Sequence, residues 1–174
     1  MKKIKGKIAV VTGAGSGIGR ATSIALARKG ATLVLADINE AGMRETAKLI
    51  SAAGGTSSAH VVNVADKRRM QAFADEIDTL HGRVDIVVNN AGIGILDDFV
   101  EGSLEDFEKV VDINLWGVVY GSKMFLPMML RAGEGHIRAW CLTAPPSLRC
   151  AAFRSHCGRS WPAATSVLRR CIQA

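Results

Sequence analysis

The residues best placed to do chemistry form a glycine-rich run, Thr12-Gly13-Ala14-Gly15-Ser16-Gly17-Ile18-Gly19. It follows a short apolar segment and opens a helical pattern, as phosphate-binding turns do. Glycines let backbone amides approach a pyrophosphate, and the amino end of a helix favours its negative charge. The alternative is a turn that only joins a strand to a helix. We predict a dinucleotide site at the following positions: Gly13, Gly15, Ser16, Gly17, Ile18 and Gly19.

A carboxylate follows the glycine run at the distance expected of a dinucleotide site. Asp37 closes the second apolar segment, 18 residues after Gly19. A carboxylate at this point can accept hydrogen bonds from both hydroxyls of an adenosine ribose, and it repels a 2′-phosphate. The sequence therefore favours NAD over NADP. The alternative is an ordinary acid at a helix start, beside Asn39 and Glu40.

Strands and helices alternate through most of the chain. Continuous apolar runs, typical of strands buried on both faces, occur at residues 8–11, 32–36, 60–62 and 85–88. Helical spacing of apolar residues is found at about 17–30, 41–53, 67–80 and 103–127. This order predicts an α/β fold, a doubly wound parallel sheet of the Rossmann type. We expect the sheet to be truncated after about its fifth strand, which begins near residues 133–137.

The composition changes abruptly at residue 138. Residues 1–137 contain 16 basic and 16 acidic side chains, whereas residues 138–174 contain six arginines and no acid. All four cysteines lie in this second part, which has no Lys, Asn, Tyr or Met. The net charge of +6 therefore comes entirely from residues 138–174, and residues 1–137 have no net charge. We predict a Rossmann domain at 1–137 and a tail of different origin at 138–174.

The chain has no apolar run long enough to span a membrane, and its amino-terminal apolar run is broken by Thr12 and by glycines. No small-residue cleavage pattern of a signal peptide follows. We expect a cytoplasmic protein that does not bind membranes, with reduced cysteines.

Over about residues 5–137 the chain resembles the short-chain dehydrogenase/reductase family. The resemblance is carried by T-G-x-x-x-G-I-G at residues 12–19, the acid closing the second strand, N-N-A-G at residues 89–92, and Asn114 within D-I-N-L-W-G. It implies that Asn90, Ala91 and Gly92 lie against the cofactor ribose and steady the central sheet. Turn propensity alone would also allow N-N-A-G after a strand.

The resemblance assigns roles to three further residues. Asn63 stands where the family often has an Asp that faces the adenine amino group, and its amide oxygen can accept the same bond. Val64 is assigned to the same site. Asn114 corresponds to the family residue that anchors a water in the proton relay; the alternative is an exposed helix Asn. Enzymes of this kind transfer a hydride between NAD(H) and an alcohol or carbonyl substrate.

The family's catalytic Ser, Tyr and Lys are not found at their expected places. Counting on from residue 137 puts Leu142 at the serine position, Ser155 at the tyrosine position and Arg159 at the lysine position. The single tyrosine, Tyr120, is followed by Lys123 at three residues rather than four, so we regard it as a packing residue. Asn114 is then the one remaining member of the catalytic set. We expect no turnover of a small alcohol or ketone; the alternative function is a non-catalytic dinucleotide-binding fragment.

The tail at 138–174 admits three explanations. Zinc could bind His156 and the four cysteines, but no C-x-x-C pair occurs among them. Nucleic acid could bind the six arginines with Trp140 and Trp161, but they follow no recognisable module. We favour a reading-frame change, an alternative splice junction or an annotation error near codon 138, and expect neither metal nor nucleic-acid binding. The family's oligomer interface would then be lost and a central strand left as a bare edge.

Overall fold

The computed structural model describes residues 4–94, 102–139 and 153–154. One sheet has the order β3-β2-β1-β4-β5-β6, in which the first five strands are parallel and β6 is antiparallel to β5. The strands are β1 (Ile8–Thr12), β2 (Thr32–Asp37), β3 (Thr56–Val61), β4 (Ile86–Asn89), β5 (His136–Ala139) and β6 (Phe153–Arg154). The predicted doubly wound parallel sheet is confirmed.

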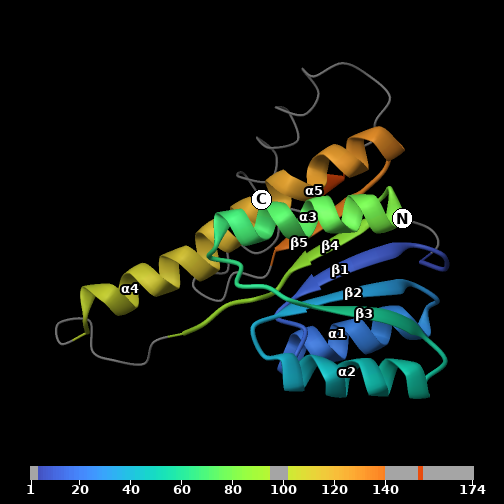
Figure 1. Ribbon diagram of the computed structural model, residues 1–174, viewed down its shortest axis with the longest axis horizontal. Coiled ribbons are helices and arrows are strands. Elements are labelled where there is room, and N and C mark those ends of the chain that lie inside the picture. Colours follow the sequence, from blue (N-terminus) through green and yellow to red (C-terminus); the bar gives the residue numbers. More distant parts are fainter. Residues whose placement is uncertain (1–3, 95–101, 140–152, 155–174) are drawn as a thin grey trace.

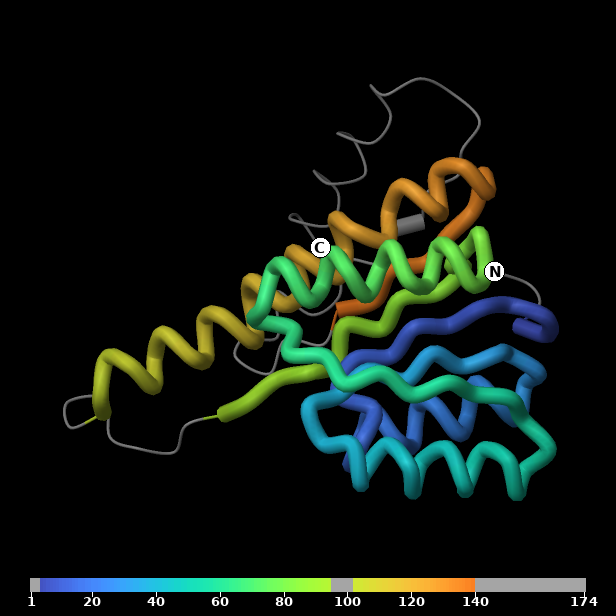
Figure 2. Tube along the Cα trace, in the orientation of Figure 1, coloured from blue at the N-terminus to red at the C-terminus, as the bar shows by residue number. Residues whose placement is uncertain are grey.

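Helices cover both faces of the sheet (Figures 1 and 2). Helices α1 (Gly17–Arg28) and α2 (Glu40–Ala52) lie on one face, and α3 (Lys67–His81) and α5 (Gly117–Ala132) lie on the other. Successive residues of β1 enter different cores: Val10 packs with the α3 and α5 side, and Val11 with the α1 and α2 side. This double burial explains why the strands are apolar without alternation.

The third strand is longer than the sequence indicated. We expected it at residues 60–62, but β3 begins at Thr56 and pairs with the whole of β2. Because β3 has one neighbour in the sheet, its residues are exposed or half-buried and many are polar. An edge strand therefore escapes a search for continuous apolar runs.

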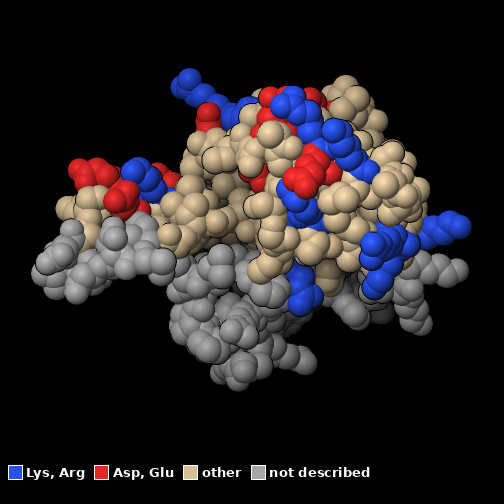
Figure 3. All heavy atoms as spheres, turned by 90° about the horizontal axis from the view of Figure 1, so that it is seen from below, with Lys and Arg blue, Asp and Glu red and all other residues tan. Residues whose placement is uncertain are grey.

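The fourth predicted helix is three segments. After α4 (Leu104–Val111) comes a π-helical turn, η1 (Asp112–Trp116), and α5 then continues past Pro127 to Ala132. Helix α4 contributes no buried residue and projects from the body of the protein (Figure 1). Acidic side chains gather at this end of the molecule with basic atoms among them, and charges of both signs also mix over the face formed by α1 and α2 (Figure 3).

The first half of β5 has a neighbouring strand on its outer side, where the sequence predicted a bare edge. Residues His136 and Ile137 pair with the two residues of β6. The pairing is short because β6 has only two residues.

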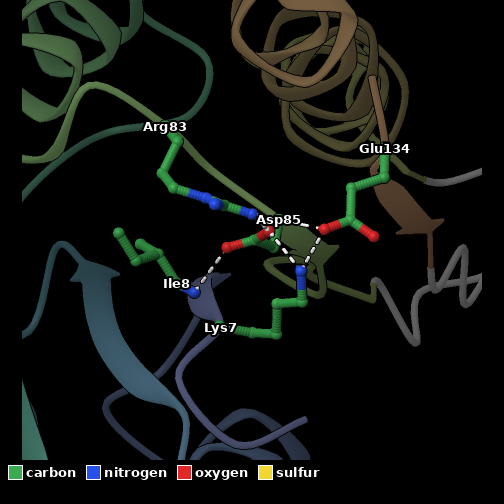
Figure 4. Close-up of polar contacts among 5 residues, drawn as sticks. All are labelled: Lys7, Ile8, Arg83, Asp85 and Glu134. Atoms are coloured by element: carbon green, nitrogen blue, oxygen red, sulfur yellow. Dashed lines mark hydrogen bonds and ion pairs between the residues drawn. The ribbon is translucent and has the colours of Figure 1, made fainter. Parts of the chain in front are cut away.

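A buried carboxylate ties three strands together at the amino-terminal edge of the parallel sheet (Figure 4). Asp85 accepts hydrogen bonds from the Ile8 amide at 2.9 Å, from Lys7 Nζ at 3.0 Å and from Arg83. Lys7 and Arg83 both also contact Glu134, which precedes β5. Burial raises the pKa of Asp85, but the hydrogen bonds from Arg83, Ile8 and Lys7 outweigh it and hold the pKa below its ordinary 3.8.

We predict that Asp85→Asn lowers the free energy of unfolding at pH 7 by about 2 kcal/mol, because charge-assisted hydrogen bonds are lost from a buried site. A carboxylate whose pKa is lowered by folding stabilises the protein above its unfolded-state pKa, and this stabilisation disappears as the pH falls through the folded-state value. Urea denaturation should therefore show the difference between wild type and variant shrinking below about pH 4.

The matched control is Glu40→Gln, which removes the exposed pair between Glu40 and Arg44. Exposed pairs contribute less than about 1 kcal/mol, so this variant should unfold almost as wild type does. If Asp85→Asn and Glu40→Gln have equal effects at pH 7, the Asp85 cluster does not hold the strands together.

Candidate dinucleotide-binding site

A cavity of about 450 Å³ opens at the carboxyl ends of the parallel strands. Its volume lies within the range of small-ligand sites. It is lined by Gly13, Ser16, Gly17, Ile18, Asp37, Ile38, Val62, Asn63, Val64, Asn90, Ala91, Gly92, Ile93 and Ile113. Ten of the residues selected from the sequence are therefore brought together, from four separate loops. Gly15, Gly19 and Asn114 do not line the cavity.

The glycine-rich loop packs too tightly for side chains at two positions. Gly13 has a φ of +66°, and a Cβ there would lie 2.9 Å from both Ala91 Cα and Asn90 Nδ2. A Cβ on Gly19 would collide with the carbonyl oxygen of Gly13. Gly13 thus lets the end of β1 lie against the N-N-A-G segment, and Gly19 lets α1 approach the end of β1. Close packing therefore requires these glycines, in addition to the turn itself.

Asp37 is held in place by the backbone on both sides of the cavity rim. Its Oδ2 accepts a hydrogen bond from the Gly15 amide at 2.8 Å, and its Oδ1 accepts one from the Asn39 amide at 2.9 Å. The cap of α2 is Asn39, whose Oδ1 accepts from the Gly42 amide at 2.9 Å. Asp37 is therefore not merely an acid that starts a helix.

The N-N-A-G segment is bonded to the end of β1. The Thr12 hydroxyl accepts hydrogen bonds from the amides of Asn90 at 3.0 Å and Ala91 at 3.1 Å. Asn90 Nδ2 returns bonds to the carbonyl oxygens of Thr12 and Gly13 at 3.1 and 3.3 Å. These bonds join β1 to β4 beside the cavity, and Gly92 follows along its wall.

Asn63 and Val64 form the part of the wall that follows β3. Asn63 is exposed, and its Oδ1 accepts a hydrogen bond from the Ala65 amide at 3.0 Å. Val64 is buried, and a Cβ on Gly117 would lie 2.8 Å from its Cγ2. The absence of a side chain at Gly117 thus lets α5 pack against this wall.

Asn114 acts on the cavity indirectly. It lies in the π-helical turn, where it is buried rather than exposed. Its Oδ1 accepts from the Ile93 amide at 2.9 Å, and its Nδ2 donates to the Ile93 carbonyl oxygen at 2.8 Å. The alternative of an exposed helix residue is therefore wrong. In this structure Asn114 fixes the backbone that leaves the N-N-A-G segment.

Sequence reasoning missed the apolar part of the wall, namely Ile38, Val62, Ile93 and Ile113. Each is the direct chain neighbour of a residue that was selected: Asp37, Asn63, Gly92 and Asn114, respectively. Apolar walls with a few polar groups are typical of sites for ring-shaped ligands. The apolar residues next to the selected positions could therefore have been predicted from the sequence as part of the cavity wall.

Several predicted positions lie outside the described residues, namely Leu142, Ser155, Arg159, the four cysteines, His156, Trp140 and Trp161. Tyr120 packs against the core and stacks on Trp116, with 5.7 Å between ring centroids, as a packing residue would. Across 4–94, 102–139 and 153–154, no group of His, Cys, Asp and Glu could hold a metal ion. No helix within those ranges has the length and apolarity to cross a bilayer.

We predict that Gly13→Ala destabilises the protein by about 3 kcal/mol, because a positive φ and a steric overlap act together. The matched control is Gly54→Ala, since Gly54 has a φ of +77° but open space around it. The backbone cost alone is about 1 kcal/mol. Urea denaturation measures both variants, and equal losses would contradict the close packing of Gly13 against Ala91.

The fold and cavity agree with comparisons to known proteins. The model of the family named short chain dehydrogenase matches residues 7–139. EphD, a probable oxidoreductase of Mycobacterium tuberculosis, is 46% identical over 125 residues, which are 72% of this chain and 21% of EphD. Human epidermal retinol dehydrogenase 2 is 38% identical over 137 residues, which are 78% of this chain and 44% of that enzyme. The chain thus spans half or less of the length of these relatives.

Solved structures show the same relationship. Xylitol dehydrogenase bound to NAD⁺ has a TM-score of 0.75 and 29% identity, covering 79% of this chain and 54% of that one. A metagenomic short-chain oxidoreductase in complex with NADP has a TM-score of 0.78 and 28% identity, and the match covers 98% of this chain and 75% of that one. The fold, the cavity and the family match agree, and the chain belongs to the short-chain dehydrogenase family.

Proposed function

We propose that this chain binds a nicotinamide dinucleotide in the described cavity, with NAD(H) preferred over NADP(H). The observation that carries the proposal is the meeting of the glycine-rich loop, Asp37 and the N-N-A-G segment around one cavity. Each came from a different loop, and each presents groups that suit a different part of the same ligand.

The residues present fit such a cofactor. The amides of Ser16 and Gly17 stand at the amino end of α1, where the first amides of a helix have no intrahelical partner and favour an anion. Asp37 presents oxygen acceptors that suit ribose hydroxyls. Ile38, Val62 and Ile93 supply apolar contact for flat rings. When bound, the nicotinamide accepts or donates a hydride.

The preference for NAD(H) rests on the charge of Asp37. In NADP(H) a 2′-phosphate replaces the ribose hydroxyl that would lie beside this carboxylate. The negative charges of the phosphate and of Asp37 would then repel one another. The similar structures include one with NAD⁺ and one with NADP, so the preference for NAD(H) is argued from this chain's own residues.

For activity we propose an oxidoreductase by ancestry that does not turn over an alcohol or ketone in this form. The support is in the sequence, since no lysine follows Lys123 and the counted catalytic positions hold Leu142, Ser155 and Arg159. The family model also ends at residue 139, close to the change of composition at 138. We further propose that a reading-frame change, an alternative splice junction or an annotation error near codon 138 produced the tail. The family's oligomer interface is then lost, and the protein is cytoplasmic.

We predict that NADH binds to one site and that NADPH binds at least about tenfold more weakly, a difference of about 1.4 kcal/mol. The variant Asp37→Asn removes the charge and should bring the two affinities within about threefold. Fluorescence titration of both cofactors measures this. Equal affinities in the wild-type protein would contradict the assigned role of Asp37.

Turnover is tested separately, with NAD⁺ and a panel of primary, secondary and cyclic alcohols. We expect no increase in NADH absorbance above that of a blank without protein. If the wild-type chain produces NADH and the control does not, this chain has a complete set of catalytic residues, and the proposed loss of activity is refuted.

A further inference from the structure

Arg20 is the first residue after the glycine-rich run, where a cation could be expected to touch a phosphate. The structure places it elsewhere. Its side chain does not line the cavity, and its guanidinium reaches from α1 across to α2. There it forms an ion pair with Glu45, with 2.9 Å between Arg20 Nη2 and Glu45 Oε2. Its charge is therefore compensated on the far side of the loop.

The guanidinium is bonded to the loop itself. Arg20 Nη2 donates to the Gly15 carbonyl oxygen at 2.6 Å and approaches the Gly42 carbonyl oxygen at 3.5 Å. Arg20 Nε donates to the Thr46 hydroxyl at 3.1 Å. Thr46 is fully buried, and its Oγ1 lies 2.9 Å from the carbonyl oxygen of Ala14. Two successive carbonyl groups of the loop are thus held from behind.

Because peptide units are planar and trans, holding a carbonyl group also fixes the direction of the N–H that follows it. In such a unit the carbonyl oxygen and the following N–H point to opposite sides. The Ala14 carbonyl faces Thr46, and the next N–H, that of Gly15, accordingly donates to Asp37 on the other side. By the same geometry, the Gly15 carbonyl that faces Arg20 turns the Ser16 N–H away from Arg20, and Ser16 lines the cavity.

We propose that Arg20 is a positioning residue, which acts through the Gly15 carbonyl to aim the Ser16 amide at the pyrophosphate of the dinucleotide. This inference rests on the proposed function of the cavity. Arg20 contributes orientation and not charge, because Glu45 neutralises it and no part of it lines the cavity. It also links α2 to the loop, since the same guanidinium contacts Thr46.

The test compares Arg20→Gln with Glu45→Gln in the whole chain. Arg20→Gln should weaken NADH binding about tenfold in fluorescence titrations, because the Ser16 amide is no longer fixed. Glu45→Gln leaves the bond to Gly15 in place and should keep the affinity within twofold. If Arg20 instead acted by its charge, Glu45→Gln would free that charge and tighten NADH binding more than threefold, which would overturn the proposal. Wild-type affinity in Arg20→Gln would also overturn it.

A second measurement does not depend on NADH. The ¹⁵N relaxation order parameter of the Ser16 amide should be about 0.85 in the wild-type protein and below about 0.6 in Arg20→Gln. An unchanged order parameter would refute the positioning role even if NADH binds. Failure of the wild type to bind NADH would refute the proposed function alone, and the order parameters would still decide the role of Arg20. If Arg20→Gln does not fold by circular dichroism, Arg20→Met, which has no hydrogen-bond donor, replaces it with the same criteria.

Discussion

One hydroxyl group holds the two central strands together where the cavity opens. Thr12 Oγ1 accepts hydrogen bonds from two successive amides, those of Asn90 and Ala91, and lies 3.5 Å from the carbonyl oxygen of Val88 as a donor. Its bonding capacity is then filled, and the residue is buried. The junction fixes the start of the Gly13 turn and the N-N-A-G segment, since Asn90 also donates to the carbonyl oxygens of Thr12 and Gly13. Asn114 separately holds the backbone of Ile93. The ends of β1 and β4 thus form one side of the cavity wall.

At the opposite, amino-terminal ends of the parallel strands, a charged cluster stabilises the fold. There Asp85 joins the segments that lead into β1, β4 and β5, with Lys7, Arg83 and Glu134 around it (Figure 4). Strand β4 thus connects a charged cluster at its start to the candidate site at its end. In an open parallel sheet, ligands bind at the carboxyl ends of the strands, so the two tasks do not compete for the same residues.

Sequence patterns anticipated most of the sheet and of the cavity wall, because both depend on local signals. The glycines of the loop follow a buried strand, and Asp37 and N-N-A-G lie at the ends of two others. Features that depend on tertiary structure were harder to predict from the sequence. The bounds predicted for β3 were wrong because an edge strand needs no apolar run. The π-helical turn at Asn114 has no simple sequence pattern. The role of Arg20 was also hidden, since its partners Gly15 and Thr46 come from different elements and only folding brings them together.

The chain thus matches its family over residues 7–139, which include the candidate dinucleotide site, and the composition changes where catalytic residues are expected. The central claim is that this part binds a dinucleotide by itself. A ¹⁵N–¹H correlation spectrum recorded during titration with NAD⁺ tests it most directly. We expect saturable shifts confined to the amides around the cavity, such as Ser16, Gly17, Asp37 and Ala91, with those near Asp85 unmoved. A folded protein whose cavity amides do not shift at millimolar NAD⁺ would contradict the account.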